Sequence, residues 1–254
     1  MGKVFIGTAG WSIASRYAAD FPVGGTHLER YGRRLACVEI DTSFYREHKI
    51  ETYERWAASV PADFRFSIKL PKAITHEKRL VGCGDLLARF FSQANHLGEK
   101  LGVVVVQTPP NLVYEPSKVD AFVEALRAET KAPVAIEPRH ETWFDGAADA
   151  QLERLGITRI AADPARFAAA GDPGGSADLA YFRLHGSPRI YYSDYPADAL
   201  DRMRLRLDQA LIKGAEVWCI LDNTAEGHAL GNALSLARHP PEPAPNRSVE
   251  ADAT

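Results

Sequence analysis

Residues 102–106 read Gly-Val-Val-Val-Val, and Gln107 follows this apolar run as its first polar side chain. A strand with one solvent-facing side alternates apolar and polar residues, whereas a continuous β-branched run is typical of a strand buried on both faces. Strands of this kind occur in parallel sheets that helices cover on both sides. The run therefore predicts a parallel α/β architecture.

Short segments rich in β-forming residues recur along the chain, with helical stretches between them. The predicted strands span residues 4–9, 37–43, 65–70, 102–108, 134–138, 158–163, 180–185 and 217–222. In the helical stretches apolar residues recur three or four positions apart, as Leu87, Phe91 and Ala94 do. Eight strand–helix repeats in 254 residues match the size of a (β/α)₈ TIM barrel, so we expect a single barrel domain over residues 1–239.

Three segments refine this expectation. A dinucleotide-binding sheet would carry GxGxxG after its first strand, but the chain continues there as Gly7-Thr-Ala-Gly-Trp11, so we exclude that fold. Glycine and proline interrupt residues 171–175, which predicts a degenerate sixth helix with one turn at residues 168–170. Residues 240–254 are rich in Pro, Ala and Glu and have little to bury, which predicts a disordered tail.

Composition indicates an ordinary globular protein. Hydrophobic residues make up 46% and charged residues 25%, and the net charge of -3 gives no general attraction to polyanions. The three cysteines show no CxxC spacing, which argues against a zinc knuckle or a disulfide framework. The N-terminal residues lack a secretory core, and no apolar run approaches the length that spans a bilayer. We therefore expect a cytoplasmic protein without a membrane partner.

Strand periodicity separates polar from apolar side chains. In residues 37–43, Val38 and Ile40 share one face, and Glu39 and Asp41 share the other. The polar side chains at or near the strand ends are Glu39, Asp41, Lys69, Gln107, Glu137, Arg139, Asp163, Arg183, His185 and Asp222. An ion-pair network that only fills the interior is the alternative, but it would not need to occupy nearly every strand end. Because TIM-barrel active sites lie at the carboxyl ends of the strands, we predict a functional site there.

The residue types in this ring favour acid/base chemistry on an anion. The candidate catalytic residues are Glu137, His185, Asp222, Glu39 and Asp41. The candidate substrate-binding residues are Lys69, Arg139, Arg183, Gln107, Tyr45, Arg46, His76, Trp11, Trp143 and Asn223. Guanidinium groups bind phosphate or carboxylate through paired donors, and aromatic side chains stack on sugars or bases. Further aromatic residues in the loops, Phe44, Tyr191, Tyr192 and Tyr195, extend the expected rim.

Other chemistries stay open. Glu137, Asp163, His185 and Asp222 lie on successive strands and form a candidate set of divalent-metal ligands. Arg183 lies on one of the same strands, and Arg139 directly follows another, so both arginines would neutralise those carboxylates. We therefore predict no cofactor and keep a divalent metal as the minority hypothesis. Paired carboxylates also suit glycoside hydrolysis, and a desolvated Lys69 suits a Schiff base.

Several motifs resemble the YecE-like family of uncharacterised proteins. They are Ile6-Gly-Thr-Ala-Gly-Trp11, Val38-Glu-Ile-Asp-Thr-Ser-Phe-Tyr-Arg46, Phe64-Arg-Phe-Ser-Ile-Lys-Leu-Pro-Lys72 with Ile74-Thr-His76, Gln107-Thr-Pro-Pro110, Ile136-Glu-Pro-Arg-His140 with Trp143, Tyr181-Phe-Arg-Leu-His-Gly186 and Leu221-Asp-Asn-Thr224. The resemblance extends to about residue 237, with Asp163 the weaker match at the sixth strand. It implies a TIM barrel and names no reaction.

We therefore expect an enzyme, a hydrolase or lyase, that acts on a small phosphate- or sugar-bearing anion. Glu137 and His185 would exchange protons while Lys69, Arg139 and Arg183 hold the anion. The alternatives are a non-catalytic nucleic-acid-binding or regulatory protein and a metal-dependent phosphoesterase or isomerase. An extended basic track outside the ring would favour nucleic acid, whereas a closed bowl would favour a small molecule. No oligomeric state is predicted.

Overall fold

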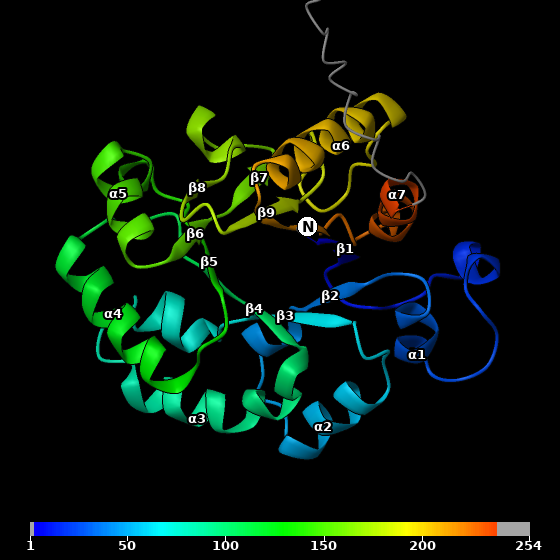
Figure 1. The fold of residues 1–254 in the computed structure, drawn as a ribbon, viewed down its shortest axis with the longest axis horizontal. Helices are drawn as coiled ribbons and strands as arrows, with labels where there is room; N and C mark the ends of the chain where they lie inside the picture. Colours follow the sequence, from blue (N-terminus) through cyan, green and yellow to red (C-terminus); the bar gives the residue numbers. More distant parts are fainter. Residues whose placement is uncertain (1–2, 238–254) are drawn as a thin grey trace, which may run out of the picture.

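The computed structural model describes residues 3–237, with parallel strands at the centre and helices around them (Figure 1). The predicted tail at residues 240–254 lies outside this range. The strands are β1 (Val4–Thr8), β2 (Cys37–Ile40), β3 (Arg65–Lys69), β4 (Leu101–Gln107), β5 (Val134–Glu137), β6 (Ile157–Arg159), β7 (Ala161–Asp163), β8 (Gly174–Gly175), β9 (Leu179–Leu184) and β10 (Glu216–Leu221). The α-helices are α1 (His27–Gly32), α2 (Ile50–Ala58), α3 (Gly84–Ala94), α4 (Pro116–Glu129), α5 (Gly146–Arg154), α6 (Ala197–Ile212) and α7 (His228–Ala237).

The strands form two hydrogen-bonded sheets. One has the order β2-β3-β4-β5-β6-β8 and the other the order β1-β10-β9-β7, and every pairing except that of β8 is parallel. An isolated parallel bridge between Ala9 and Glu39 joins β1 to β2, and the Gly10 amide donates to the Glu39 carbonyl at 2.9 Å. The predicted parallel α/β architecture is therefore confirmed.

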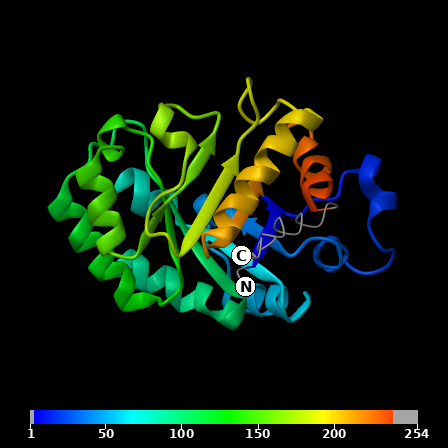
Figure 2. The ribbon, with the colours of Figure 1, turned by 45° about the horizontal axis from the view of Figure 1, so that its top comes forward.

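Each predicted strand is present, and the sixth is divided. Residues 157–163 pair with β5 up to Arg159 and with β9 from Ala161 onward, so the chain changes neighbour at Ile160. The Ile160 amide still donates to the Ile136 carbonyl at 2.8 Å. Figure 2 shows β7 and β9 running side by side at this edge. A sequence pattern of period two cannot reveal such an exchange of partners, because side-chain alternation continues through it.

The sixth connection contains a single 3₁₀ turn, Ala168–Gly171, as its glycines and prolines predicted. The two-residue strand β8 that follows was not predicted. It pairs antiparallel with β6, and Gly175 adopts a left-handed φ of 65° there. A Cβ atom on Gly175 would lie 2.4 Å from the Ile157 carbonyl oxygen, so glycine is required at this close approach.

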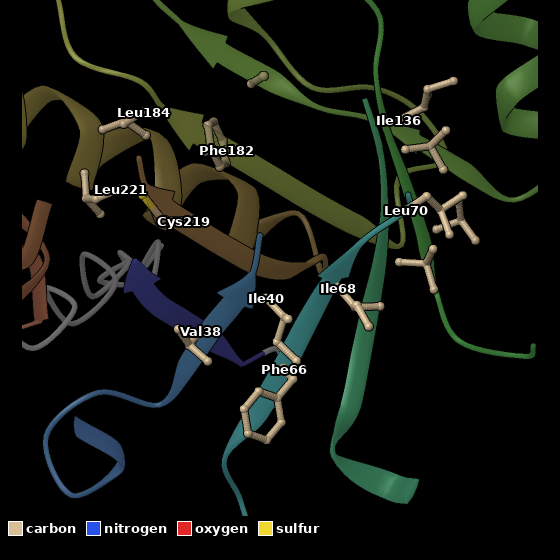
Figure 3. Packing of buried hydrophobic residues seen from close by; sticks show 14 of the residues in the cluster. Val38, Ile40, Phe66, Ile68, Leu70, Ile136, Phe182, Leu184, Cys219 and Leu221 are labelled. Atoms are coloured by element: carbon tan, nitrogen blue, oxygen red, sulfur yellow. The ribbon is translucent and has the colours of Figure 1, made fainter. Parts of the chain in front are cut away.

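One face of the strands packs against the helices. Val38, Ile40, Phe66 and Ile68 project from β2 and β3 into this outer core (Figure 3). The remaining outward apolar residues that the figure labels are Leu70, Ile136, Phe182, Leu184, Cys219 and Leu221. Their alternation with the polar residues agrees with the predicted faces, so the strand periodicity assigned the inner and outer sides correctly.

A second apolar cluster fills the inner side. It consists of Phe5, Cys37, Val103, Val105, Ala135, Ile160, Leu179, Tyr181, Trp218 and Ile220. Trp218 stacks between Phe5, at 4.8 Å between ring centroids, and Tyr181, at 5.9 Å. These rings close the inner side below the polar strand ends, so the charged side chains have an apolar floor. Among residues 3–237 no helix is both long and apolar enough to cross a membrane.

Candidate functional site

Arg183 is at the centre of the polar strand ends. It projects inward from β9, and its side chain is 0% exposed. Its guanidinium donates to Glu39 at 2.6 and 3.1 Å, to Glu137 at 2.7 Å and to Asp222 at 3.2 Å. A buried charge is tolerated only when it is paired and hydrogen-bonded, and Arg183 meets this condition through three strands.

Glu137 accepts the largest set of hydrogen bonds. Besides Arg183, its donors are Arg139 at 2.8 and 3.1 Å, His185 at 3.1 Å and Gln107 at 3.2 Å. Burial alone would raise the pKa of the Glu137 carboxyl, but His185 and Arg183 hold it well below its usual value. Glu137 is therefore a carboxylate whose acceptor sites are already occupied.

His185 lies between two carboxylates. Its Nδ1 is 2.9 Å from Asp222 and its Nε2 is 3.1 Å from Glu137. Burial would lower the pKa of the imidazole, but Glu137 and the hydrogen bond to Asp222 raise it above 6.5. The pKa of Asp222 is lowered despite burial, because Arg183 and His185 stabilise its charged form. His185 is thus an imidazolium donor to both carboxylates.

Glu39 joins this group to the apolar floor. The Tyr181 hydroxyl donates to Glu39 at 3.0 Å and lies 2.8 Å from the Ser67 hydroxyl. Burial raises the pKa of the Glu39 carboxyl, and the opposing effect of Arg183 does not cancel it. Tyr181 was not among the predicted site residues, although it lies two positions before Arg183 and so on the same strand face. We call Glu39, Glu137, Arg183, His185 and Asp222 the buried charge network.

Two more ionised side chains lie above this network. The Lys69 ammonium donates to Asp41 at 2.8 Å and lies 4.5 Å from the centre of the Phe44 ring. The Asp41 side chain is 30% exposed and uses only Oδ1 in this pair, whereas Lys69 is 7% exposed. Glu39, Asp41, Glu137 and Asp222 then face Lys69, Arg139, Arg183 and protonated His185, so the eight charges balance.

Three side chains near the carboxyl ends of the strands keep unused hydrogen-bonding capacity. Within residues 3–237, Arg139 Nη1 and His76 Nε2 have no hydrogen-bond partner, and Lys69 Nζ has only Asp41. Partial burial, followed by the charges of Lys69 and Arg139, lowers the pKa of the His76 imidazole. The two cations therefore act on the His76 ring from β3 and from the end of β5. We call Lys69, His76 and Arg139 the mouth donors.

His76 reaches this position on an irregular segment. Residues Ala73–Glu77 form a single π-helical turn, and the chain then adopts left-handed φ angles at Arg79 (52°) and Leu80 (66°). Single π turns often occur at functional sites, and left-handed non-glycine residues store strain. The His76 ring packs edge-on against Phe44, with 5.1 Å between centroids.

The structure corrects three of the predicted ligand contacts. Arg183 was expected to hold the anion, but its buried guanidinium is committed to three carboxylates. Trp143 was expected in the cleft, but it is 1% exposed and its indole donates to the Leu112 carbonyl at 2.8 Å. Asn223 is also fully buried, and its amide donates to the Ser193 carbonyl and to Asn232. Sequence position placed these residues at strand ends, but burial removes them from the opening.

Three of the predicted rim residues, Trp11, Tyr45 and Arg46, form no side-chain hydrogen bond to the mouth donors within residues 3–237. Trp11 is half-buried and packs edge-on against Trp56, with 5.0 Å between centroids. Tyr45 is 75% exposed and contacts the Phe44 ring, and Arg46 is exposed. None of the three forms a hydrogen bond to the buried charge network within the described part of the chain.

The four candidate metal ligands do not form one group. Asp163 accepts a hydrogen bond from Tyr195 at 2.7 Å, whereas Glu137, His185 and Asp222 bind one another and Arg183. No group of three or more His, Cys, Asp or Glu side chains among residues 3–237 has a geometry suited to a metal ion. Arg183 donates to Glu137 and Asp222 instead.

A family model described as "Protein of unknown function DUF72" matches residues 5–250. The chain belongs to the DUF72 family. The UPF0759 protein YecE of Escherichia coli K12 is 30% identical over 168 residues, which cover 63% of this chain and 59% of YecE. The UPF0759 protein YunF of Bacillus subtilis 168 is 25% identical over 147 residues, covering 56% of this chain and 52% of YunF. The chain thus spans little more than half the length of the curated relatives it matches, and the predicted YecE-like resemblance is confirmed.

Solved DUF72 structures share the fold. A DUF72 family protein from Enterococcus faecalis V583 superposes with a TM-score of 0.78 at 20% identity, covering 92% of this chain and 94% of that protein. One from Thermotoga maritima MSB8 gives a TM-score of 0.75 at 22% identity, with coverages of 92% and 97%. At these identities the similarity establishes the fold alone.

Proposed function

We propose that this DUF72 protein is an enzyme, a hydrolase or lyase, that binds a small phosphate-bearing anion between Lys69, His76 and Arg139. The proposal treats the two sheets as halves of one (β/α)₈ barrel, joined by the Ala9–Glu39 bridge and by the passage of the chain through Ile160. In such a barrel the carboxyl ends of the strands form the active-site face. The observation that carries the proposal is the unused hydrogen-bonding capacity of the mouth donors beside the buried charge network.

Glu137 and Asp41 fix two of the mouth donors instead of binding the ligand. Glu137 holds Arg139 by Nε and Nη2, which leaves Nη1 directed away from the pair. Asp41 holds Lys69 in the same way from β2. A guanidinium and an ammonium that are already oriented lose little entropy when an anion binds, so their hydrogen bonds contribute more to affinity.

Proton exchange with a ligand would fall to His76 and Asp41. The lowered pKa of His76 leaves its imidazole neutral near pH 7, so Nε2 can accept a proton there. Asp41 Oδ2 has no hydrogen-bond partner among the described residues and belongs to a partly exposed carboxylate. Glu137 and His185 suit this role less well, because their polar atoms are buried and bonded to each other.

The surface charges favour a small ligand over a nucleic acid. Two exposed cations are paired with carboxylates: Lys72 lies 3.8 Å from Glu77, and Arg89, on α3, lies 2.5 Å from Glu47. Nucleic-acid binding draws on an extended set of cations that is free to contact phosphates. Such pairing leaves fewer cations available for a basic track.

Thermal unfolding with inorganic phosphate, titrated at constant ionic strength, tests the anion site. Saturation at a hundredfold excess over the dissociation constant should stabilise the fold by roughly 2.7 kcal/mol through mass action. Arg139→Gln should reduce this phosphate-dependent shift, because the amide loses the charge and the paired donors. Arg202→Gln, at an exposed arginine on α6, is the matched control and should keep the full shift. An equal shift in Arg139→Gln would remove Arg139 from the site.

Release of inorganic phosphate from a panel of phosphate monoesters tests the hydrolase assignment, and product analysis by mass spectrometry tests the lyase assignment. Asp41→Asn should lower the turnover rate by roughly 10²–10⁴-fold if Asp41 transfers the proton. Unchanged turnover in Asp41→Asn would transfer that role to another group.

A further inference from the structure

The loop after β9 carries Tyr191, which has an unusual backbone for a bulky residue. Its φ angle is 70°, in the left-handed region that aromatic side chains rarely adopt. Both of its backbone polar groups are bound: its amide donates to the His185 carbonyl at 2.5 Å, and its carbonyl accepts from the Ala225 amide at 3.0 Å. The loops after β9 and β10 together hold the strained residue, and such strain often accompanies functional positions.

The Tyr191 side chain lies beside the buried charge network. Its ring is 6.0 Å from the His185 ring, with an angle of 86° between the planes. His185 shares a carboxylate oxygen with Arg139: Glu137 Oε1 is 3.1 Å from His185 Nε2 and accepts from Arg139 Nη2 at 2.8 Å. Tyr191 is 39% exposed, and its hydroxyl makes no hydrogen bond within residues 3–237. Tyr191 therefore offers a ring and a free hydroxyl beside a histidine that shares its carboxylate with a mouth donor.

We infer that Tyr191 determines specificity at the site, and that it selects a phosphate monoester of a cyclic sugar. This inference rests on the proposed anion site and names the group attached to the phosphate. With the phosphate on Arg139, Lys69 and His76, the sugar ring packs against the Tyr191 ring. The Tyr191 hydroxyl then hydrogen-bonds to a sugar hydroxyl. An open-chain phosphate has no ring face to place against the aromatic ring.

The neighbouring residue provides an unusually close control. Tyr192 has the same exposure of 39%, but its ring lies 3.8 Å below the Arg189 guanidinium carbon. Its contact is therefore with the loop itself. Replacement of Tyr192 removes the same side chain from the same loop and leaves the mouth donors and Tyr191 in place.

The test compares the dissociation constants of ribose 5-phosphate and glycerol 3-phosphate, which carry the same phosphate charge, with inorganic phosphate as reference. The wild-type protein should bind ribose 5-phosphate about tenfold more tightly than glycerol 3-phosphate, as expected for one aromatic contact. Tyr191→Ala should abolish this ratio and leave the affinity for inorganic phosphate unchanged. Tyr191→Phe should reduce the ratio only in part, and Tyr192→Ala should preserve it. Tyr191→Asn is a second variant that tolerates the left-handed backbone, so loss of the ratio with an unchanged melting temperature would exclude misfolding.

Each outcome bears on one of the two proposals. A protein that binds inorganic phosphate but does not distinguish the two esters would overturn the inference about Tyr191 and leave the anion site intact. A preference for ribose 5-phosphate that persists in both Tyr191→Ala and Tyr191→Asn would also overturn the inference about Tyr191. Failure of all three phosphates to bind would overturn the proposed function together with the inference.

Discussion

At the scale of single residues, Arg183 decides the character of the site. It is the only side chain among the described residues that is bonded to Glu39, Glu137 and Asp222 at once. Its removal would leave three carboxylates buried with one fewer cation. We therefore expect Arg183→Met to lower the free energy of unfolding by roughly 3–5 kcal/mol, as is usual when one member of a buried ion pair is deleted.

Urea denaturation measures this effect, with Arg202→Met as the control. Arg202 is 67% exposed and pairs with Asp198 across one helical turn, so its removal should change stability by less than about 0.5 kcal/mol. Equal stability of Arg183→Met and the wild-type protein would mean that the three carboxylates do not depend on this arginine.

His185 should make stability depend on pH. Because its folded-state pKa lies above 6.5, its charged form contributes stability that is fully present below pH 6.5 and is lost as the pH rises through the folded-state pKa. The stability difference between wild type and His185→Gln should therefore shrink as the pH is raised from about 6 to 9. His48 and His76 have lowered pKa values, so each contributes stability that is present above pH 6.5 and is lost as the pH falls below 6.5. A difference that stays constant or grows with pH would show that His185 is neutral in the folded protein.

At the scale of elements, the site depends on the meeting of β1 and β2. Gly7 lies on β1, and a Cβ atom there would be 2.1 Å from the Cys37 carbonyl oxygen of β2. Gly7→Ala should force these strands apart and lower stability by roughly 1–3 kcal/mol, as overpacking does. Gly84, in the first turn of α3, has no atom within 4 Å of an added Cβ, so Gly84→Ala should be neutral or slightly stabilising.

Melting temperatures of the two alanine variants test this prediction. Phosphate binding adds a second measurement, because displacement of β2 would also displace Asp41 and its partner Lys69. A Gly7→Ala protein with wild-type stability and phosphate response would show that the two sheets tolerate separation at this junction.

At the scale of the whole molecule, anion binding and proton uptake should be coupled. His76 is neutral near pH 7 because partial burial, Lys69 and Arg139 lower its pKa, and a bound anion would offset those charges. The complex then holds the proton more firmly than the free protein, so affinity for sulfate should rise as the pH falls from about 7.5 to 5.5. Sulfate is the suitable probe because its charge is constant over this range.

Calorimetric titration in two buffers of different ionisation enthalpy measures the proton uptake directly. His76→Asn should abolish the pH dependence, whereas His96→Asn, at an exposed histidine that pairs with Glu54, should retain it. Proton uptake that persists in His76→Asn would assign the coupling to His185 or another group.

The amino-acid sequence by itself determined the parallel α/β architecture, the inner and outer faces of the strands and the inventory of polar strand ends. Unbroken apolar runs are typical of parallel strands that are buried on both faces, and alternation with a period of two assigns every side chain to one side. These are local properties, so local pattern suffices to predict Glu39, Lys69 and Arg183 as inward-facing residues.

Only the tertiary structure decided which of those residues are fully paired and which keep unpartnered atoms among the described residues. Burial and pairing depend on the tertiary structure. Every side-chain nitrogen of Arg183 and His185 contacts a carboxylate from another strand, whereas Arg139 Nη1 and His76 Nε2 have no hydrogen-bond partner within residues 3–237. The exchange of partners at Ile160, the close approach at Gly175 and the strained Tyr191 also depend on contacts between distant segments. The sequence pattern cannot predict these contacts, because hydrogen bonds across a sheet depend on which strands become neighbours.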